Sequence, residues 1–126
     1  MADAAQSELG EDKTLMLVDD DEPFLRRLAK AMEKRGFEIE TADSVAGGKA
    51  IATARPPAYA VIDLRLEDGN GLDVVEVLRE RRPDSSVVVL NGYGAIATAV
   101  AAVKIGATDY LSKPEDATDI TNALLA

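Results

Sequence analysis

Three aspartates and one lysine have the residue types and the spacing that could do chemistry in this chain. Asp19, Asp20, Asp63 and Lys113 each follow closely on a short apolar run. If these runs are parallel strands, the groups that follow them gather at one edge of the sheet. Crowded carboxylates repel one another, and a hard divalent cation such as Mg²⁺ relieves that repulsion. A cation and a lysine beside a carboxylate suit phosphoryl transfer, because its transition state spreads charge over the phosphoryl oxygens.

The elements that must position these residues alternate between strand and helix. Apolar runs of the length typical of buried parallel strands lie at about residues 14–19, 37–42, 59–63, 87–91 and 109–111. Helical patterns with start or stop signals lie at about residues 21–35, 44–55, 72–82, 95–105 and 115–126. This alternation predicts an α/β fold built on a parallel sheet.

Local signals refine several of these elements. Acidic residues and a proline from Asp21 onward predict the start of the first helix, and Ser44 is expected to cap the second. The pair Gly47-Gly48 should weaken that second helix, since each glycine costs about 1 kcal/mol relative to alanine. Residues 37–42 alternate apolar and charged side chains, as an edge strand does. A turn is expected over residues 68–71.

The composition excludes several kinds of chemistry. The chain has 126 residues, of which 47% are apolar, enough for one packed domain. It has no cysteine and no histidine, which excludes thiol catalysis, disulfides, histidine zinc ligands and a phosphohistidine. The net charge of −9 does not suit direct nucleic acid binding, which needs clustered lysine and arginine. No apolar stretch is as long as a membrane span, and we expect a cytoplasmic protein.

The two ends of the chain differ from its middle. Residues 1–13 are small, polar and acidic without periodicity, and are interpreted as a flexible tail. Residues 14–126 form the single predicted domain. The last predicted helix reaches Ala126 without a C-cap or a stop signal, so we expect the protein to continue beyond it.

Three other patterns have competing interpretations. Residues 92–97 match the dinucleotide fingerprint G-x-G-x-x-G/A, and Asp109 lies near the ribose-contact position. Only about 17 residues follow Asp109, too few for the rest of a dinucleotide fold, so small residues that let a helix start close to its strand explain the match better. The alanine-rich face of residues 95–105 suits core packing and a partner helix equally. We interpret Arg79, Arg81 and Arg82 as part of a solvated face at a helix end, where positive charges are favoured.

The combined motifs resemble the receiver domain of two-component response regulators over residues 14–126. The resemblance rests on Val18-Asp19-Asp20-Asp21, on Asp63 at the end of the third strand, and on Lys113-Pro114 after the fifth. The stretch from Arg55 to Gly71 is most similar to the RegA/PrrA/ActR group of redox-responsive transcription regulators from photosynthetic and related bacteria. The implied fold is flavodoxin-like (CheY-like), doubly wound, with five helices and a five-stranded parallel sheet of order 2-1-3-4-5.

The resemblance also implies the roles of the site residues. Asp63 would be phosphorylated by a membrane sensor histidine kinase, and Lys113 would pair with the phosphoryl group. Asp20 and Asp63 would hold Mg²⁺ directly, Arg65 through its backbone carbonyl, and Asp19 mainly through water. Mn²⁺ is expected to substitute for Mg²⁺.

A second set of residues would govern the switch and its lifetime. Tyr110 would be the aromatic switch residue, and the peptide bond before Pro114 would be cis. Asn91 stands where the family has threonine or serine, so the switch is expected to differ from the family pattern. Arg65 and Tyr93 occupy positions over the site, where large side chains exclude water and slow hydrolysis.

The resulting interpretation is a phosphoacceptor switch that controls a DNA-binding output domain absent from this chain. It takes part in its own Mg²⁺-dependent phosphoryl transfer and dephosphorylation but is not a turnover enzyme. A homodimer face is expected on the fourth helix, fifth strand and fifth helix. The alternatives are a stand-alone receiver that signals by protein contact and an aspartyl-phosphate phosphatase. The phosphatase would need an acid two residues after Asp63, where Arg65 stands.

Overall fold

A parallel sheet forms the centre of the computed structural model, which describes residues 12–91, 104, 106–107, 109–112 and 116–126. Its strands are β1 (Thr14–Val18), β2 (Glu38–Ala42), β3 (Tyr59–Asp63), β6 (Ser86–Asn91) and β7 (Asp109–Ser112). They lie in the order β2-β1-β3-β6-β7, and each neighbouring pair is parallel. The predicted parallel α/β class is confirmed. The strand with alternating charge, β2, lies at an edge as expected.

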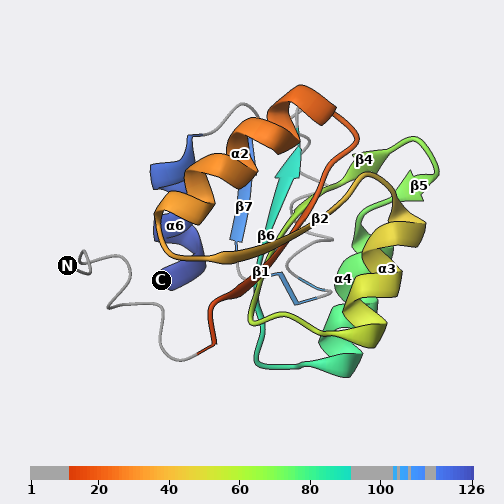
Figure 1. Cartoon of the computed structure of the whole chain (residues 1–126). Helices are drawn as coiled ribbons and strands as arrows, with labels where there is room; N and C mark the ends of the chain where they lie inside the picture. Colours follow the sequence, from red (N-terminus) through yellow and green to blue (C-terminus); the bar gives the residue numbers. More distant parts are fainter. Residues whose placement is uncertain (1–11, 92–103, 105, 108, 113–115) are drawn as a thin grey trace.

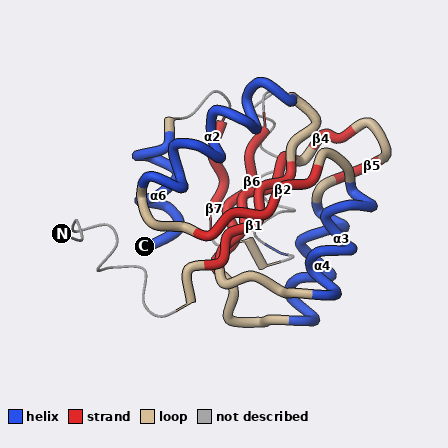
Figure 2. Tube along the Cα trace, in the orientation of Figure 1, coloured by secondary structure: helices blue, strands red, loops and turns tan. Residues whose placement is uncertain are grey.

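Helices cover both faces of this sheet. The described residues contain α2 (Glu22–Lys34), α3 (Val45–Ala54), α4 (Leu72–Arg81) and α6 (Ala117–Leu125). Figures 1 and 2 show α2 and α6 on one face and α3 and α4 on the other. The helix expected over residues 95–105 lies almost entirely outside the described residues and stays a prediction.

Two helix starts follow directly from local chemistry. The Asp21 side chain accepts a hydrogen bond from the Phe24 N–H at the start of α2, with a proline in the first turn. The Ser44 hydroxyl accepts one from the Gly47 N–H at the start of α3. Each side chain satisfies a backbone donor that has no partner within its own helix. The predicted start of the first helix and the predicted Ser44 cap of the second are confirmed.

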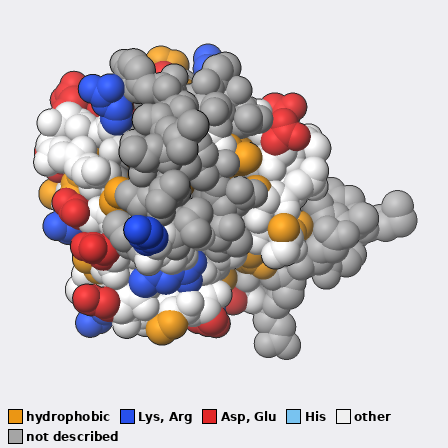
Figure 3. All heavy atoms as spheres, turned by 180° about the vertical axis from the view of Figure 1, so that it is seen from behind, with side chains coloured by type: hydrophobic (Ala, Val, Ile, Leu, Met, Phe, Trp, Pro, Cys, Tyr) orange, Lys and Arg blue, Asp and Glu red, His pale blue; other side chains and the backbone are white. Residues whose placement is uncertain are grey.

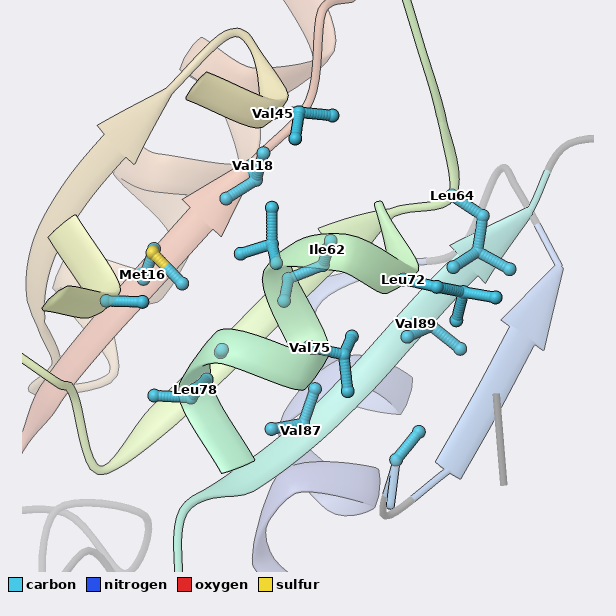
Figure 4. Close-up of a cluster of buried hydrophobic side chains, with 14 of the residues drawn as sticks. Met16, Val18, Val45, Ile62, Leu64, Leu72, Val75, Leu78, Val87 and Val89 are labelled. Atoms are coloured by element: carbon cyan, nitrogen blue, oxygen red, sulfur yellow. The ribbon is translucent and has the colours of Figure 1, made fainter. Parts of the chain in front are cut away.

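The core consists of two layers separated by the sheet. Alternate residues of β1 point to opposite faces, so Met16 and Val18 join one layer while Leu15 and Leu17 join the other. The first layer, drawn in Figure 4, packs the sheet against α3 and α4. The second packs it against α2 and α6. A slip of one residue in register would exchange the two faces, so burial on both sides holds the strand ends in place.

Gly48 allows α3 to lie close to its neighbours. A Cβ atom at this position would lie 3.0 Å from Cγ2 of Val74 in α4 and 3.2 Å from Cγ2 of Val18 in β1. The expected weakening of α3 by its glycine pair did not include this packing role of Gly48. The conformational cost of glycine at position 48 is offset by close packing of α3 against α4 and the sheet.

The segment after β3 folds into a small hairpin. Its two strands are β4 (Arg65–Leu66) and β5 (Gly69–Asn70), which pair antiparallel. The predicted turn over residues 68–71 is therefore displaced, and the chain reverses at Glu67 and Asp68. Gly69, the first residue of β5, has a φ of 149°, a conformation that residues with side chains rarely adopt. Glycine is therefore favoured at this strand position directly after the reversal.

The arginine cluster at the end of α4 lies at a helix end as predicted, with Arg81 exposed, but these side chains also make contacts that the interpretation as a solvated face did not include. Arg79 Nε donates to the Gly106 carbonyl at 2.6 Å, and Arg81 donates to the Thr53 carbonyl of α3 at 2.9 Å. Arg82 donates to the Pro56 carbonyl at 3.0 Å. Carbonyls near a helix end lack intrahelical donors, and a guanidinium group can supply several. The arginines therefore connect α4 to neighbouring segments.

Charged side chains of both signs are interspersed on the face seen from behind (Figure 3). Over the whole chain, 23 acidic residues outnumber 14 basic ones. Within the ranges that the structure describes, no helix combines the length and the apolar character needed to cross a bilayer.

Candidate functional site

Three carboxylates meet at the carboxyl edge of the sheet. Asp19 and Asp20 follow β1, and Asp63 is the last residue of β3. Each offers an oxygen atom, and these three oxygens lie within 4.8 Å of one another. Asp19 is 3% exposed and Asp63 is 5% exposed, whereas Asp20 is exposed. The cluster therefore has two buried carboxylates and a third at its solvent side, and the three acids meet at one sheet edge as predicted.

Backbone hydrogen bonds hold the loop that carries the first two acids. The Asp19 N–H donates to the Ala42 carbonyl of β2 at 3.1 Å. The Asp19 Oδ1 atom accepts from the Asp21 N–H at 2.8 Å, and Asp21 caps α2 in turn. The loop between β1 and α2 is thus fixed at both sides, which keeps the Asp19 carboxylate near Asp63.

The end of β3 positions the third acid. The Leu64 N–H donates to the Leu90 carbonyl at 3.0 Å, so pairing with β6 continues one residue past Asp63. The Arg65 N–H donates to Asp63 Oδ1 at 3.2 Å. This bond orients the Asp63 carboxylate and brings the backbone of Arg65 beside the cluster.

Gly71 lies directly against the backbone of Asp63. A Cβ atom on Gly71 would lie 2.1 Å from the Asp63 carbonyl oxygen and 2.9 Å from Cγ2 of Ile62. Gly71 has φ −59° and ψ −20°, which any residue can adopt, so space and not conformation requires glycine here. The start of α4 and the end of β3 can approach this closely only without a side chain at position 71.

Replacement of Gly71 by alanine should therefore destabilise the fold and disturb Asp63. Because the atom in the way is backbone, the methyl group must displace α4 or the end of β3, at a cost of about 1–3 kcal/mol. Urea unfolding should show the loss of stability, and the affinity for Mg²⁺ should fall. Glu76→Ala, at an exposed position of α4, is the control and should change both quantities little. A Gly71→Ala chain with wild-type stability would contradict the close approach.

The remaining predicted site residues are only partly placed. Asn91 ends β6 and pairs with Ser112 in the register of the sheet, while Tyr110 of β7 pairs with Val89. The backbones of Asn91 and Tyr110 thus lie in adjacent strands. Lys113, Pro114 and Tyr93 fall outside the described residues, and their roles stay predictions.

Two residues near the site were not predicted to belong to it. Asp68 and Gly71 were assigned only to a turn, but Asp68 binds the start of α3 and Gly71 packs on Asp63. Neither contact has a local signal, because each depends on how distant segments pack. The sole hint is the concentration of turn residues immediately after a candidate nucleophile.

The arrangement suits a hard cation and a phosphoryl group. Oxygens on opposite sides of an octahedral Mg²⁺ ion are about 4 Å apart, and the three carboxylate oxygens lie within 4.8 Å of one another, so they can reach one ion. A carboxylate at a fixed strand end, with a backbone N–H to orient it, is also a positioned nucleophile. The three acids can therefore supply both cation ligands and a phosphoacceptor.

The sequence of this chain matches a known protein family. A family model for the response regulator receiver domain matches residues 15–125. The photosynthetic apparatus regulatory protein RegA of Cereibacter sphaeroides is 80% identical over 126 residues, which cover 100% of this chain and 68% of that protein. The acid tolerance regulatory protein ActR of Rhizobium meliloti is 63% identical over 123 residues, covering 97% and 63% respectively. The chain thus spans about two thirds of the length of these relatives.

A solved structure agrees with the fold of this chain. It is a response regulator protein from Burkholderia pseudomallei with a phosphorylated aspartic acid, a calcium ion and citrate. Its TM-score to this chain is 0.86 at 38% identity, and the match covers 90% of this chain and 66% of that one. A divalent cation and a phosphorylated aspartate thus occur together in a protein of similar fold.

Proposed function

This chain belongs to the response regulator receiver domain family, within the RegA/PrrA/ActR group, and we propose that it accepts a phosphoryl group on Asp63 from a histidine kinase. Receiver domains of this kind act as regulatory switches and not as classical enzymes. The observation that carries the proposal is the meeting of Asp19, Asp20 and Asp63 within 4.8 Å at the carboxyl edge of the sheet. Asp19 and Asp63 are both buried and each accepts a backbone N–H. The place of Asp63 at the end of β3, where the receiver family carries its phosphoacceptor, selects it for this role.

The chain's own residues perform the transfer in this proposal. A carboxylate oxygen of Asp63 forms a bond to phosphorus while the bond from phosphorus to the donor's leaving atom breaks, and the leaving group takes that electron pair. The Arg65 N–H restricts the orientation of the attacking carboxylate. Lys113 pairs with the phosphoryl oxygens. A bound Mg²⁺ ion neutralises the charge that develops on those oxygens.

The cation ligands follow from the same cluster. We assign Asp20 and Asp63 as direct ligands, Asp19 as a ligand mainly through water, and Arg65 as a ligand through its backbone carbonyl. Mn²⁺ should substitute for Mg²⁺, since both accept oxygen ligands. The calcium ion in the similar Burkholderia pseudomallei structure supports a divalent cation in this kind of protein.

The wider protein is proposed by likeness to its relatives. Residues 1–13 form an acidic tail, residues 14–126 form the receiver domain, and a DNA-binding output domain lies outside this chain. A fifth helix over residues 95–105 completes the flavodoxin-like fold.

The kinase partner is a membrane sensor, and the receiver works in the cytoplasm without binding nucleic acid itself. The regulatory names of RegA and ActR support a role in transcription control. The fourth helix, fifth strand and fifth helix provide a face for a homodimer.

Incubation with acetyl phosphate tests the proposed function. The wild-type chain should gain the mass of one phosphoryl group in the presence of Mg²⁺, and EDTA should suppress that gain. Chemical lability of the adduct at alkaline pH would identify an acyl phosphate. A chain that binds no Mg²⁺ and gains no mass would reject the proposal.

Asn91 should separate phosphorylation from its structural consequence. The family hydroxyl at this position bonds a phosphoryl oxygen, whereas the longer amide must crowd the site to do so. We expect Asn91 to change the energy gap between the two states by about 1–2 kcal/mol, the low end of the scale of a hydrogen bond to a charged group. The equilibrium constant between the inactive and active states should then differ by about 5–30-fold. We expect the beryllofluoride-bound Asn91→Thr chain to populate the active state more than the wild-type chain does. NMR chemical shifts around Tyr110 measure this difference.

The wild-type chain with beryllofluoride provides the comparison for that experiment. Equal active populations in the two chains would mean that Asn91 replaces the hydroxyl without loss.

Arg65 and Tyr93 are proposed separately to prolong the phosphorylated state, because large side chains over the site exclude attacking water.

A further inference from the structure

The tip of the β4–β5 hairpin is bound to the start of α3. The Asp68 carboxylate accepts a hydrogen bond from the Val45 N–H at Oδ1, 2.8 Å away, and one from the Ala46 N–H at Oδ2, 3.1 Å away. Ser44 takes the next free donor, the Gly47 N–H. The amides at the start of α3, which have no partner within the helix, are therefore shared between its own cap and a side chain 22 and 23 residues further along the chain.

The same hairpin is tied to the acidic cluster at its base. Its first residue, Arg65, donates its N–H to Asp63. Beyond its last residue, the Gly71 N–H donates to the Leu64 carbonyl at 3.0 Å, and the Asn70 side chain accepts from the Leu72 N–H at 2.9 Å. Both the base and the tip of the hairpin are thus anchored, the base at Asp63 and the tip at α3.

We propose that Asp68 is a positioning residue of the phosphorylation site, which holds the backbone of Arg65 in place for the cation by clamping the hairpin to α3. This inference rests on the proposed function, in which the Arg65 carbonyl is a cation ligand. Two bonds from backbone amides to one carboxylate fix its position more firmly than a single bond would. The same bonds, first from Val45 and then from Ala46, lower the pKa of Asp68, because they stabilise its ionised form.

A role confined to helix stability would have a different signature. A cap that only stabilises α3 would lower the resistance to urea when removed but would leave the cation affinity of folded molecules unchanged. A positioning role predicts a loss of affinity in molecules that remain folded. Loss of an outer residue that orients a metal ligand typically weakens metal binding about tenfold or more.

The test compares Asp68→Ala, Asp68→Asn and Glu67→Ala by NMR titration with Mg²⁺, at a temperature where circular dichroism shows all chains folded. Glu67 is the neighbouring exposed acid at the hairpin tip, so its removal costs the same charge without the two bonds. Asp68→Ala should raise the Kd for Mg²⁺ about tenfold, while Glu67→Ala should change it little. Asp68→Asn keeps a carbonyl acceptor and should recover part of the affinity.

Phosphorylation provides a second readout on the same chains. At saturating Mg²⁺, Asp68→Ala should reach the wild-type level of labelling by acetyl phosphate, because Asp63 is intact. At Mg²⁺ concentrations near the wild-type Kd, its labelling should be slower. Equal Mg²⁺ affinity in Asp68→Ala and wild type, or equal losses in Asp68→Ala and Glu67→Ala, would overturn the positioning role. Absence of Mg²⁺ binding by the wild-type chain would instead reject the proposed function itself.

Discussion

An Asp63→Asn chain should take up no phosphoryl group from acetyl phosphate, while the wild-type chain takes up one. The amide has no ionised oxygen to attack phosphorus, so the loss should be complete within the detection of intact mass spectrometry. The fold should survive, because asparagine is close in size and its side-chain oxygen can still accept the Arg65 N–H. Removal of one charge from the crowded cluster should also raise the stability of the metal-free chain.

A matched control separates the loss of phosphorylation at Asp63 from the effect of removing one negative charge anywhere on the chain. Asp73→Asn changes an exposed acid in the first turn of α4 and should label like the wild type. Single labelling that persists in Asp63→Asn would show that another residue is the acceptor.

Removal of the Asp20 carboxylate should weaken Mg²⁺ binding severely. In Asp20→Ala the site loses both a negative charge and a direct oxygen ligand, and we expect the affinity to fall about tenfold or more. Asp19→Ala should lose less, since Asp19 is proposed to act mainly through water. Isothermal titration calorimetry with Mg²⁺ measures both affinities.

The same two variants should differ in metal-free stability. Asp20 is exposed and its removal mainly relieves repulsion, so the urea midpoint should rise. Asp19 also accepts a hydrogen bond from the Asp21 N–H at 2.8 Å. Asp19→Ala loses this bond, so its urea midpoint should rise less than that of Asp20→Ala. An Asp20→Ala chain with the wild-type Mg²⁺ affinity would contradict the assignment of the site.

The placement of the acids was predictable from strand ends. Each acid follows an apolar run, and parallel strands buried on both faces bring their carboxyl ends to one edge. The caps at Asp21 and Ser44 were predictable for a related reason, since they act within a few residues of their own helix.

Contacts between distant segments were not predictable in this way. Gly48 and Gly71 are required by the close approach of other elements, which no local pattern encodes. Asp68 reaches the start of α3, and Arg79, Arg81 and Arg82 reach carbonyls of other segments. The side chains involved are ordinary surface types in the sequence, and only tertiary packing distinguishes them. The roles of Lys113, Tyr93 and Pro114 remain predictions from the family pattern.

The location of the phosphoryl group tests the central claim most directly. After labelling by acetyl phosphate with Mg²⁺, borohydride reduction converts a phosphorylated aspartate to homoserine, which tandem mass spectrometry locates in a proteolytic peptide. Conversion should occur at Asp63 and should disappear when EDTA replaces Mg²⁺. Conversion at Asp19, Asp20 or another residue, with Asp63 unmodified, would contradict the assignment of Asp63 as the phosphoacceptor.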